Sequence, residues 1–213
     1  MAVTRTTDQI NFVQTSPFGD GDGRFEASTP VIGVTQNSLQ VSRDGVPISV
    51  GARPVWVPTG RPSVIRVDGR FDLDPNQTPL PSSTQVSWTF TTQPLAGSTP
   101  VVPPVWEADV RLPGLDTHNQ AAAGQRLAVE VNPHTIPGAT PGIASFVNFF
   151  VSPDNGTTWN FVNLTRGSDG VYRGTITGDQ VRSGGSIGLR VNTGDSQGDS
   201  VNQTQLTAVR VTG

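Results

Sequence analysis

The stretch TQVSWTFTT, residues 84–92, alternates polar and apolar side chains along its length. Val86, Trp88 and Phe90 share one side of an extended chain, because successive side chains of a β-strand point to opposite faces. The Ser and Thr residues between them share the other side. The stretch therefore predicts a strand with one face in a core and the other face in water.

The segments around this stretch repeat the pattern. SVIRVDGRFDL (63–73) alternates in the same way, and LQVSRDGVPISV (39–50) predicts a hairpin, because Asp44-Gly45 supplies the positive φ angles of a tight turn. Beyond residue 105, seven more segments have strand character: 106–112, 125–132, 144–152, 158–165, 170–177, 186–193 and 201–211. Seven short strands with frequent turns are typical of an immunoglobulin-like or fibronectin type III-like sandwich.

The segment QPLAGSTPVVPPV (93–105) separates the two groups of strands. It contains four prolines and no alternation, which favours an extended and fairly stiff connection. We therefore expect an all-β protein with two immunoglobulin- or fibronectin type III-like β-sandwich domains. The N-terminal domain would span residues 1–95, the Pro-rich linker residues 96–105, and the C-terminal domain residues 106–213.

The composition excludes several kinds of chemistry. The chain has no cysteine and no lysine, so disulfides, thiolate catalysis and Schiff bases on lysine are impossible. Its 14 basic residues are all Arg and are scattered, and the net charge is −3, so we expect no nucleic-acid partner. No segment approaches the ~20 apolar residues of a membrane helix, so we expect no membrane span.

Residues SPDNGTTW (152–159) match the Asp-box pattern Ser-x-Asp-x-Gly-x-Thr-Trp. This pattern predicts a hairpin turn in which Asp154 binds backbone N–H groups and Gly156 takes a left-handed conformation. Trp159 is expected to fold back into the core. A structural role is thus the main prediction for Asp154, Gly156 and Trp159, and a glycan-related role is the alternative.

Two loops are rich in oxygen ligands of the kind that bind Ca²⁺. Neither has full EF-hand spacing, and solvated turns are the alternative for both. The candidate calcium ligands are Asp20, Asp22 and Glu26 in GDGDGRFE, and Asp72, Asp74 and Asn76 in FDLDPNQ.

No catalytic group is predicted. The two histidines, His118 and His134, lie in loop-like segments, and no Gly-x-Ser-x-Gly elbow exists. Only three glutamates occur, so paired carboxylates for glycoside hydrolysis are not expected. Trp56, between prolines in PVWVP, is the best single candidate for a binding contact if it is exposed, and a core position is the alternative.

Several of these segments together resemble the non-catalytic C-terminal region of secreted subtilisin-like serine peptidases of actinobacteria. FGDGDGRF (18–25), LQVSRDGVPI (39–48), RPSVIRVDGRF (61–71) and SSTQVSWTFTT (82–92) resemble its hairpin and strand patterns. The last β-sandwich of that region is similar to the second half of this chain, where the matching positions are Ile187, Leu189, Arg190, Val191, Asp195, Gly198, Val201, Gln203, Thr204 and Arg210. The peptidase domain is absent, so the resemblance implies an accessory module and transfers no catalytic residue.

The expected function is that of a non-catalytic, extracellular accessory module that holds or docks a protein partner, such as a peptidase domain or an assembly neighbour. A virion or extracellular-filament surface protein is the first alternative. The start at Met1, followed by a segment without the apolar core of a signal peptide, favours this alternative. A carbohydrate-binding module, with Trp56 and the Asp-box turn as contacts, is the second. No cofactor is expected apart from calcium in the two acidic loops.

Overall fold

A computed structural model of the chain describes residues 2–6, 8–13, 34–48, 55–56, 60–73, 83–116, 118–140, 142–182 and 184–213. The fold of these residues is all-β, as predicted, with one 3-10 turn, η1 (Gly178–Gln180), and no α-helix. The strands of the first half are β1 (Ala2–Arg5), β2 (Gln9–Val13), β3 (Val34–Arg43), β4 (Val46–Ile48), β5 (Val55–Trp56), β6 (Ser63–Leu73) and β7 (Ser83–Thr92). The strands of the second half are β8 (Trp106–Arg111), β9 (Gln120–Ala122), β10 (Leu127–Thr135), β11 (Phe146–Ser152), β12 (Asn160–Val162), β13 (Thr165–Arg166), β14 (Tyr172–Ile176), β15 (Ser186–Gly194) and β16 (Ser200–Thr212).

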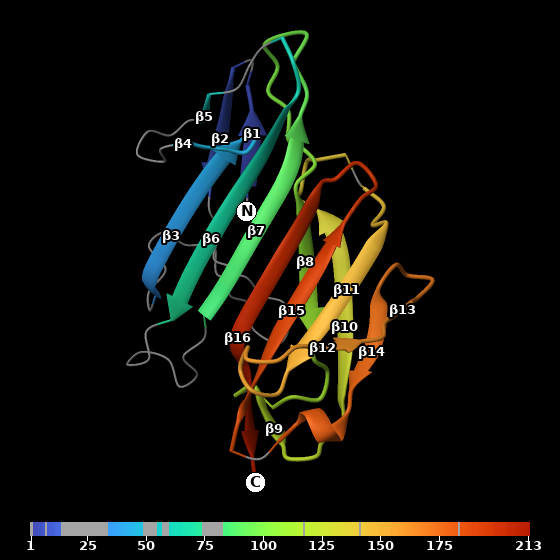
Figure 1. Ribbon diagram of the computed structural model, residues 1–213. Coiled ribbons are helices and arrows are strands. Elements are labelled where there is room, and N and C mark those ends of the chain that lie inside the picture. The colour runs from blue at the N-terminus through green and yellow to red at the C-terminus, as the bar shows by residue number, and fades with distance from the viewer. Residues whose placement is uncertain are drawn as a thin grey trace.

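The largest sheet runs through both halves of the chain. Its strand order is β12-β11-β15-β16-β7-β6-β3-β4, with β9 paired to the far end of β16 (Figure 1). Strands β7 and β16 pair in antiparallel fashion from Ser200 opposite Thr89 to Leu206 opposite Ser83. The two segments predicted as separate domains thus share one hydrogen-bonded sheet, and the independent folding of each segment stays a prediction.

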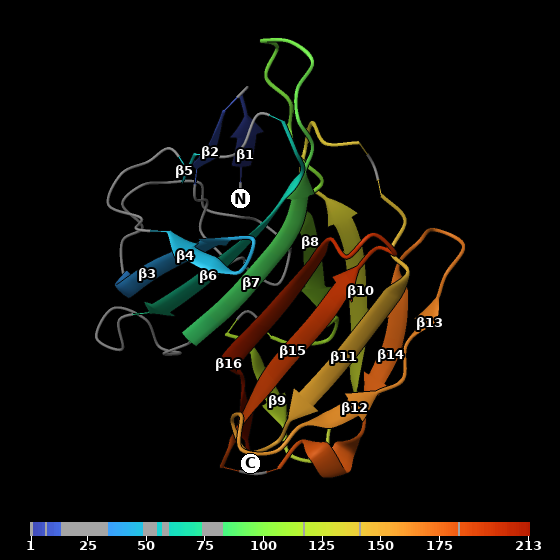
Figure 2. The same cartoon turned by 45° about the horizontal axis from the view of Figure 1, so that its top comes forward.

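Two smaller sheets stack on one face of this large sheet. The first has the order β13-β14-β10-β8 and lies behind β11, β15 and β16 in Figures 1 and 2. The second has the order β1-β2-β5 and belongs to the first half. Buried residues of all three sheets, including Ile10, Phe90, Val129 and Val191, form one continuous core. The architecture is therefore a sandwich of stacked sheets.

Local sequence explains the strands that pair in the first half. Asp44 and Gly45 have φ angles of 52° and 79°, so the β3–β4 hairpin turns where the Asp-Gly pair predicted it. The Asp44 carboxylate accepts a hydrogen bond from Val64 N at 2.9 Å, and Asp44 N donates to Val64 O at 2.8 Å. These bonds attach the hairpin turn to the start of β6, and the bond from Val64 N lowers the pKa of the Asp44 carboxyl from its usual value.

The Pro-rich connection is in part packed against the sheets. Residues 96–101 are exposed, but Pro103 and Val105 are buried. Val101 forms an isolated bridge to Arg5 of β1, and Val105 O accepts from Ile136 N at 2.9 Å. The segment thus begins as the expected exposed connection and then contacts both halves of the chain.

Candidate functional site

The outer face of the large sheet is the surface toward the viewer in Figure 1, and its residues alternate with those of the core. The strand registers align polar side chains in rows that cross both halves of the molecule. One row contains Asn148, Asn192, Asn202, Ser87, Asp68 and Gln40. The next contains Phe161, Phe150, Arg190, Thr204, Gln85, Arg70 and Ser38. All these residues are partly or fully exposed, so the face offers many hydrogen-bonding groups on a continuous surface.

Charged residues on β6 form ion pairs along the strand. Arg66 binds Asp68 through two hydrogen bonds of 2.9 and 2.7 Å, and Arg70 contacts Asp72 at 3.0 Å. Each pair is two residues apart, which places both partners on the same face of the strand. Exposed pairs of this kind contribute about 0–1 kcal/mol to stability, so they mainly set the charge pattern of the outer face.

An aromatic cluster, formed by Phe150, Trp159, Phe161 and Arg190, lies on the outer face near the β12 edge. The rings of Phe150 and Phe161 meet edge to face, with centroids 5.4 Å apart and an interplanar angle of 67°. Arg190, the cross-strand neighbour of Phe150, places its guanidinium 4.0 Å from the ring centroid of Trp159. Phe161 is 52% exposed. The cluster thus presents aromatic surface and a cation side by side to solvent.

The Asp-box turn follows β11 and supplies Trp159 to this cluster. Asp154 Oδ1 accepts from Thr158 N at 2.7 Å, and Asp154 Oδ2 accepts from Thr158 Oγ1 at 2.7 Å. Ser152 Oγ donates to Asp154 and accepts from Gly156 N at 2.6 Å. These hydrogen bonds, with those to Thr158 first, lower the pKa of Asp154 to about 2. Gly156 has a φ of 102°, a conformation that strongly favours glycine.

Trp159 is half-buried on the outer face and is not part of the core. Its ring lies close to Gly188, where a side chain would contact it. The expectation that Trp159 fills the core is therefore wrong, because the turn folds over the outer surface of β15 and leaves the ring beneath Arg190. Trp88 and Trp106, by contrast, are buried, as expected.

Asn155 connects the same turn to β16. Its Oδ1 accepts from Thr207 N at 2.6 Å, and Thr207 has a φ of 52°. Thr207 follows Leu206, the last partner of β7, and precedes Arg210, the first partner of β9. The Asp-box turn thus holds the backbone irregularity at which β16 leaves β7 and takes β9 as its neighbour.

Most of the predicted calcium ligands lie outside the described residues, namely Asp20, Asp22, Glu26, Asp74 and Asn76. The remaining candidate, Asp72, is at the end of β6 and contacts Arg70. Within the described ranges, no three His, Cys, Asp or Glu side chains come together in a way that could hold a metal ion. Calcium binding by the two loops stays a prediction.

Trp56 lies in β5, at the edge of the three-stranded sheet, with its backbone opposite Gln9. The placement of its side chain is outside the described part of the structure. Its role as a binding contact therefore also stays a prediction.

The sequence did not predict the surroundings of His134. Its Nε2 lies 3.6 Å from Glu107 Oε2 and its Nδ1 lies 3.9 Å from Asp109 Oδ2, on the outer surface of the four-stranded sheet. Hydrogen bonding to Glu107 raises the pKa of His134 above its ordinary value, although burial opposes this shift. Glu107 and Asp109 are two residues apart, so the sequence predicts that both lie on the same face of a strand. It does not predict that β8 pairs with β10, and this pairing brings the two carboxylates to His134. The other histidine, His118, is exposed and lies 4.0 Å from Asp116.

Comparison of the chain with protein-family models, with curated proteins and with solved structures finds no match. The resemblance to the C-terminal region of subtilisin-like peptidases thus rests on the residues quoted above. In the part of the chain that is described, there is no helix with the length and apolarity needed to cross a membrane.

Proposed function

We propose that this chain is a non-catalytic interaction module that docks a protein partner on the outer face of its large sheet. The observation that carries this proposal is the aromatic cluster with its 52%-exposed Phe161, set in a polar face that spans both halves. Aromatic residues and Arg are enriched in protein interfaces, where buried aromatic anchors provide most of the binding energy. Polar rows around such a cluster supply the hydrogen-bonding rim that interfaces require.

The immunoglobulin-like identity of the second half is part of the proposal. An immunoglobulin sandwich of the constant type places strands ABED in one sheet and CFG in the other. If β8 is strand A, then the order β8-β10-β14-β13 corresponds to ABED, and β11-β15-β16 corresponds to CFG. Strand β12 adds to the free edge of the second sheet. We propose that residues 106–213 form such a domain and that residues 1–95 form a second β-domain joined to it edge to edge.

The extracellular location and the kind of partner rest on the resemblance. Several of the matching positions, including Ile187, Val191 and Val201, are buried in β15 and β16, so they support a shared sandwich framework and specify no ligand. We propose a secreted accessory module whose partner is a peptidase domain. A virion or filament surface protein, whose partner is an assembly neighbour, is the alternative.

The gene sequence upstream of the chain distinguishes between these two kinds of partner. The reading frame of an accessory module continues upstream into a peptidase sequence, whereas the gene of a virion protein lies among capsid or tail genes.

The partner that this observation identifies is then titrated against the purified protein by calorimetry. Phe161→Ser should weaken binding at least about tenfold, as expected for an interface anchor. The matched control is Val46→Ser, which removes a 65%-exposed apolar residue from β4, the strand at the opposite edge of the sheet. Equal affinity of both variants and the parent would show that the aromatic cluster is not the docking surface.

The aromatic cluster also favours a second candidate function, carbohydrate binding. Flat rings next to Asn148 and Asn192 provide a stacking surface with amide groups beside it. Affinity electrophoresis in gels that contain soluble polysaccharides tests this function. Retardation that is lost in Trp159→Ala would support the outer face, and loss in Trp56→Ala would support β5. Equal migration of the parent and both variants in every gel would dismiss it.

A further inference from the structure

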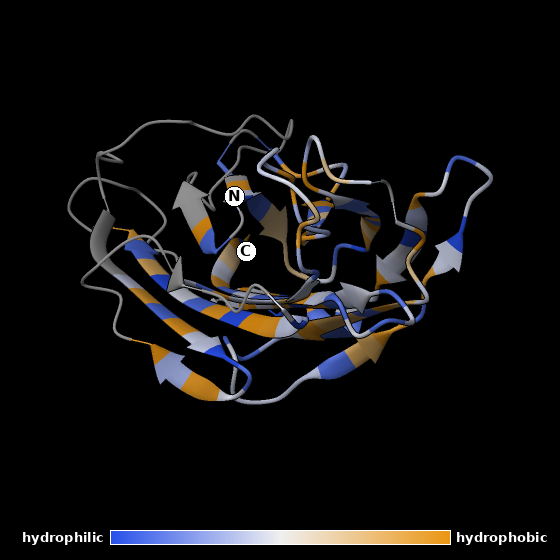
Figure 3. Ribbon diagram, turned by 90° about the horizontal axis from the view of Figure 1, so that it is seen from above, coloured by the Kyte–Doolittle hydropathy of each residue, from blue (hydrophilic) through white to orange (hydrophobic). Residues whose placement is uncertain are grey.

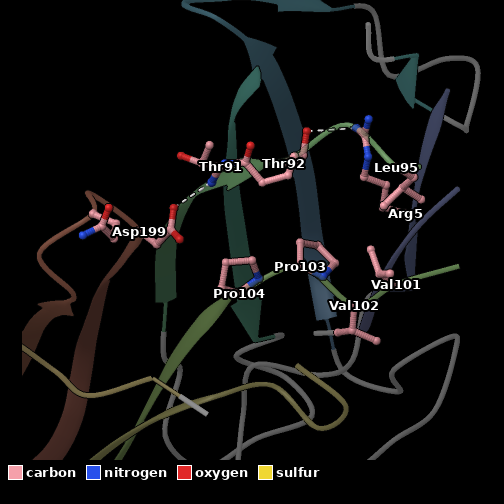
Figure 4. Close-up of a pocket in the computed structure, with 11 residues that line it drawn as sticks. Arg5, Thr91, Thr92, Leu95, Val101, Val102, Pro103, Pro104 and Asp199 are labelled. Carbon is pink, nitrogen blue, oxygen red and sulfur yellow. Dashed lines mark hydrogen bonds between the residues drawn. The ribbon is translucent and has the colours of Figure 1, made fainter. Parts of the chain in front are cut away.

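A cavity of about 320 Å³ lies where the two halves of the chain meet. Its lining comes from β1, the end of β7, the Pro-rich connection and the turn between β15 and β16. The charged residues among the lining are Arg5 and Asp199. Figure 4 shows them at opposite ends of the cavity, with Thr91 and Thr92 between them. The volume is at the lower end of the range for small-molecule sites, roughly 300–1,000 Å³.

Asp199 is a buried carboxylate, only 4% exposed. Its Oδ1 accepts from Thr91 N at 2.7 Å. The turn that holds it is organised by Asp195, whose Oδ1 accepts from Gln197 N at 2.8 Å and from Asp199 N at 3.1 Å. Burial raises the pKa of Asp199, the Thr91 hydrogen bond opposes this shift, and the charge of Asp195 adds to it. A buried carboxylate beside another carboxylate is costly unless a cation compensates it.

Arg5 provides the opposite charge on the other wall. It is 1% exposed, and its Nη1 donates to Thr92 Oγ1 at 2.9 Å. Its backbone is fixed by two hydrogen bonds to Val101, of 2.8 and 2.9 Å. Because Thr91 and Thr92 are consecutive, Arg5 Nη1 lies within about 13 Å of Asp199 Oδ1 by covalent geometry alone.

We propose that this cavity binds a small zwitterionic molecule of the amino-acid or dipeptide class. The ligand's ammonium group contacts Asp199, and its carboxylate contacts Arg5. Both protein charges are held in place before binding, by Thr91 and by Thr92, so little order has to be gained when the ligand enters. The site is separate from the outer-face aromatic cluster, and it does not depend on the proposed docking function.

The test is a titration of the ¹⁵N-labelled protein, followed by NMR, with glycine, 4-aminobutyrate, 6-aminohexanoate and glycylglycine. This series varies the distance between the two ligand charges. The Thr91 amide, which donates to Asp199, reports directly on the cavity. We expect saturable shifts of this amide for at least one zwitterion, with a Kd of about 1 mM or lower. Butylamine and butyrate, each with a single charge, should bind at least about tenfold more weakly, since each loses one of the two charge contacts.

Two variants examine the cavity itself. Asp199→Asn keeps an acceptor for Thr91 but removes the charge, and it should weaken zwitterion binding by about tenfold or more. Leu95→Trp keeps both charges but fills the cavity, and it should abolish binding. Asp179→Asn, an exposed change in η1, is the matched control and should leave binding unchanged. Absence of saturable shifts below about 10 mM in the folded parent, or equal binding by the parent and Leu95→Trp, would overturn the proposal.

Discussion

The two faces of the large sheet are formed by the same strands, yet they differ in almost every property. Along β6, Ile65, Val67 and Phe71 are buried, while Arg66 and Arg70, the residues between them, are exposed. The bands of hydrophilic and hydrophobic residues along the strands in Figure 3 follow this alternation. One-residue spacing thus separates side chains that stabilise the fold from side chains that are available for recognition, and each face can be changed without the other.

The largest effect is expected on the inner face, at Trp88→Ala. Trp88 lies between Val67 of β6 and Val201 of β16, at the seam between the two halves. Removal of a buried Trp side chain should lower the free energy of unfolding by about 3–5 kcal/mol. Urea unfolding followed by fluorescence measures this change.

The control for Trp88 is Thr89→Ala, the next residue on the same strand but on the outer face. It should cost less than about 1 kcal/mol. We also expect one cooperative transition for the parent, because both halves share the β7–β16 pairing. Two separate transitions, with only one of them shifted by Trp88→Ala, would show that the halves are thermodynamically independent.

An intermediate effect is expected for Trp159→Ala, on the outer face. Trp159 contacts Arg190 and its ring lies close to Gly188, but it is only half-buried, so the loss should be about 1–2 kcal/mol. Thermal and urea unfolding measure it. A loss as large as that of Trp88→Ala would mean that the outer face contributes to stability as much as the core does.

The Asp-box carboxylate gives a pH test of the outer face. The pKa of Asp154 falls from an ordinary 3.8 to about 2 in the folded chain. Its contribution to stability is therefore complete above pH 3.8 and is lost as the pH falls through about 2. In Asp154→Asn the urea midpoint should depend less on pH in this range. The pKa of Asp169 is also about 2, because Arg173 binds its carboxylate, so part of the pH dependence of stability remains in the variant. An unchanged pH profile would contradict the role of Asp154.

The smallest effect is expected for Asn202→Ala, in the middle of the outer polar row. Asn202 is exposed, and its cross-strand neighbours are Asn192 and Ser87. The free energy of unfolding should change by no more than about 0.5 kcal/mol. A large loss, measured by the same urea titration, would indicate that the row is part of the folding framework.

The sequence predicts the strands well because alternation and turn chemistry are local signals. SVIRVDGRFDL was expected to form a strand, and β6 has these bounds. Asp44-Gly45 marked the first hairpin, and each of the seven segments predicted after residue 105 overlaps a strand. After residue 105, two of the described strands were missed, β9 and β13, which are three and two residues long and too short to show a period.

The neighbours of each strand could not be predicted in this way. Alternation predicts which side chains face the core. It does not predict that β7 pairs with β16, which lies more than a hundred residues further along the chain. The same limit applies to the candidate sites. Phe150 and Trp159 meet Arg190 only through strand order, and the cavity joins Arg5 to Asp199 across almost the whole chain. The turn at Asp154 was visible in the sequence because the hydrogen bonds of the Asp154 carboxylate, to Ser152 and Thr158, are local.

The position of β16 has a consequence for biosynthesis. It leaves the ribosome after both of its neighbours, β7 and β15, yet it lies between them in the large sheet. Until it emerges, β7 and β15 both expose unpaired backbone edges, which are prone to associate with other chains. The nascent protein should therefore need protection by a chaperone until β16 is translated.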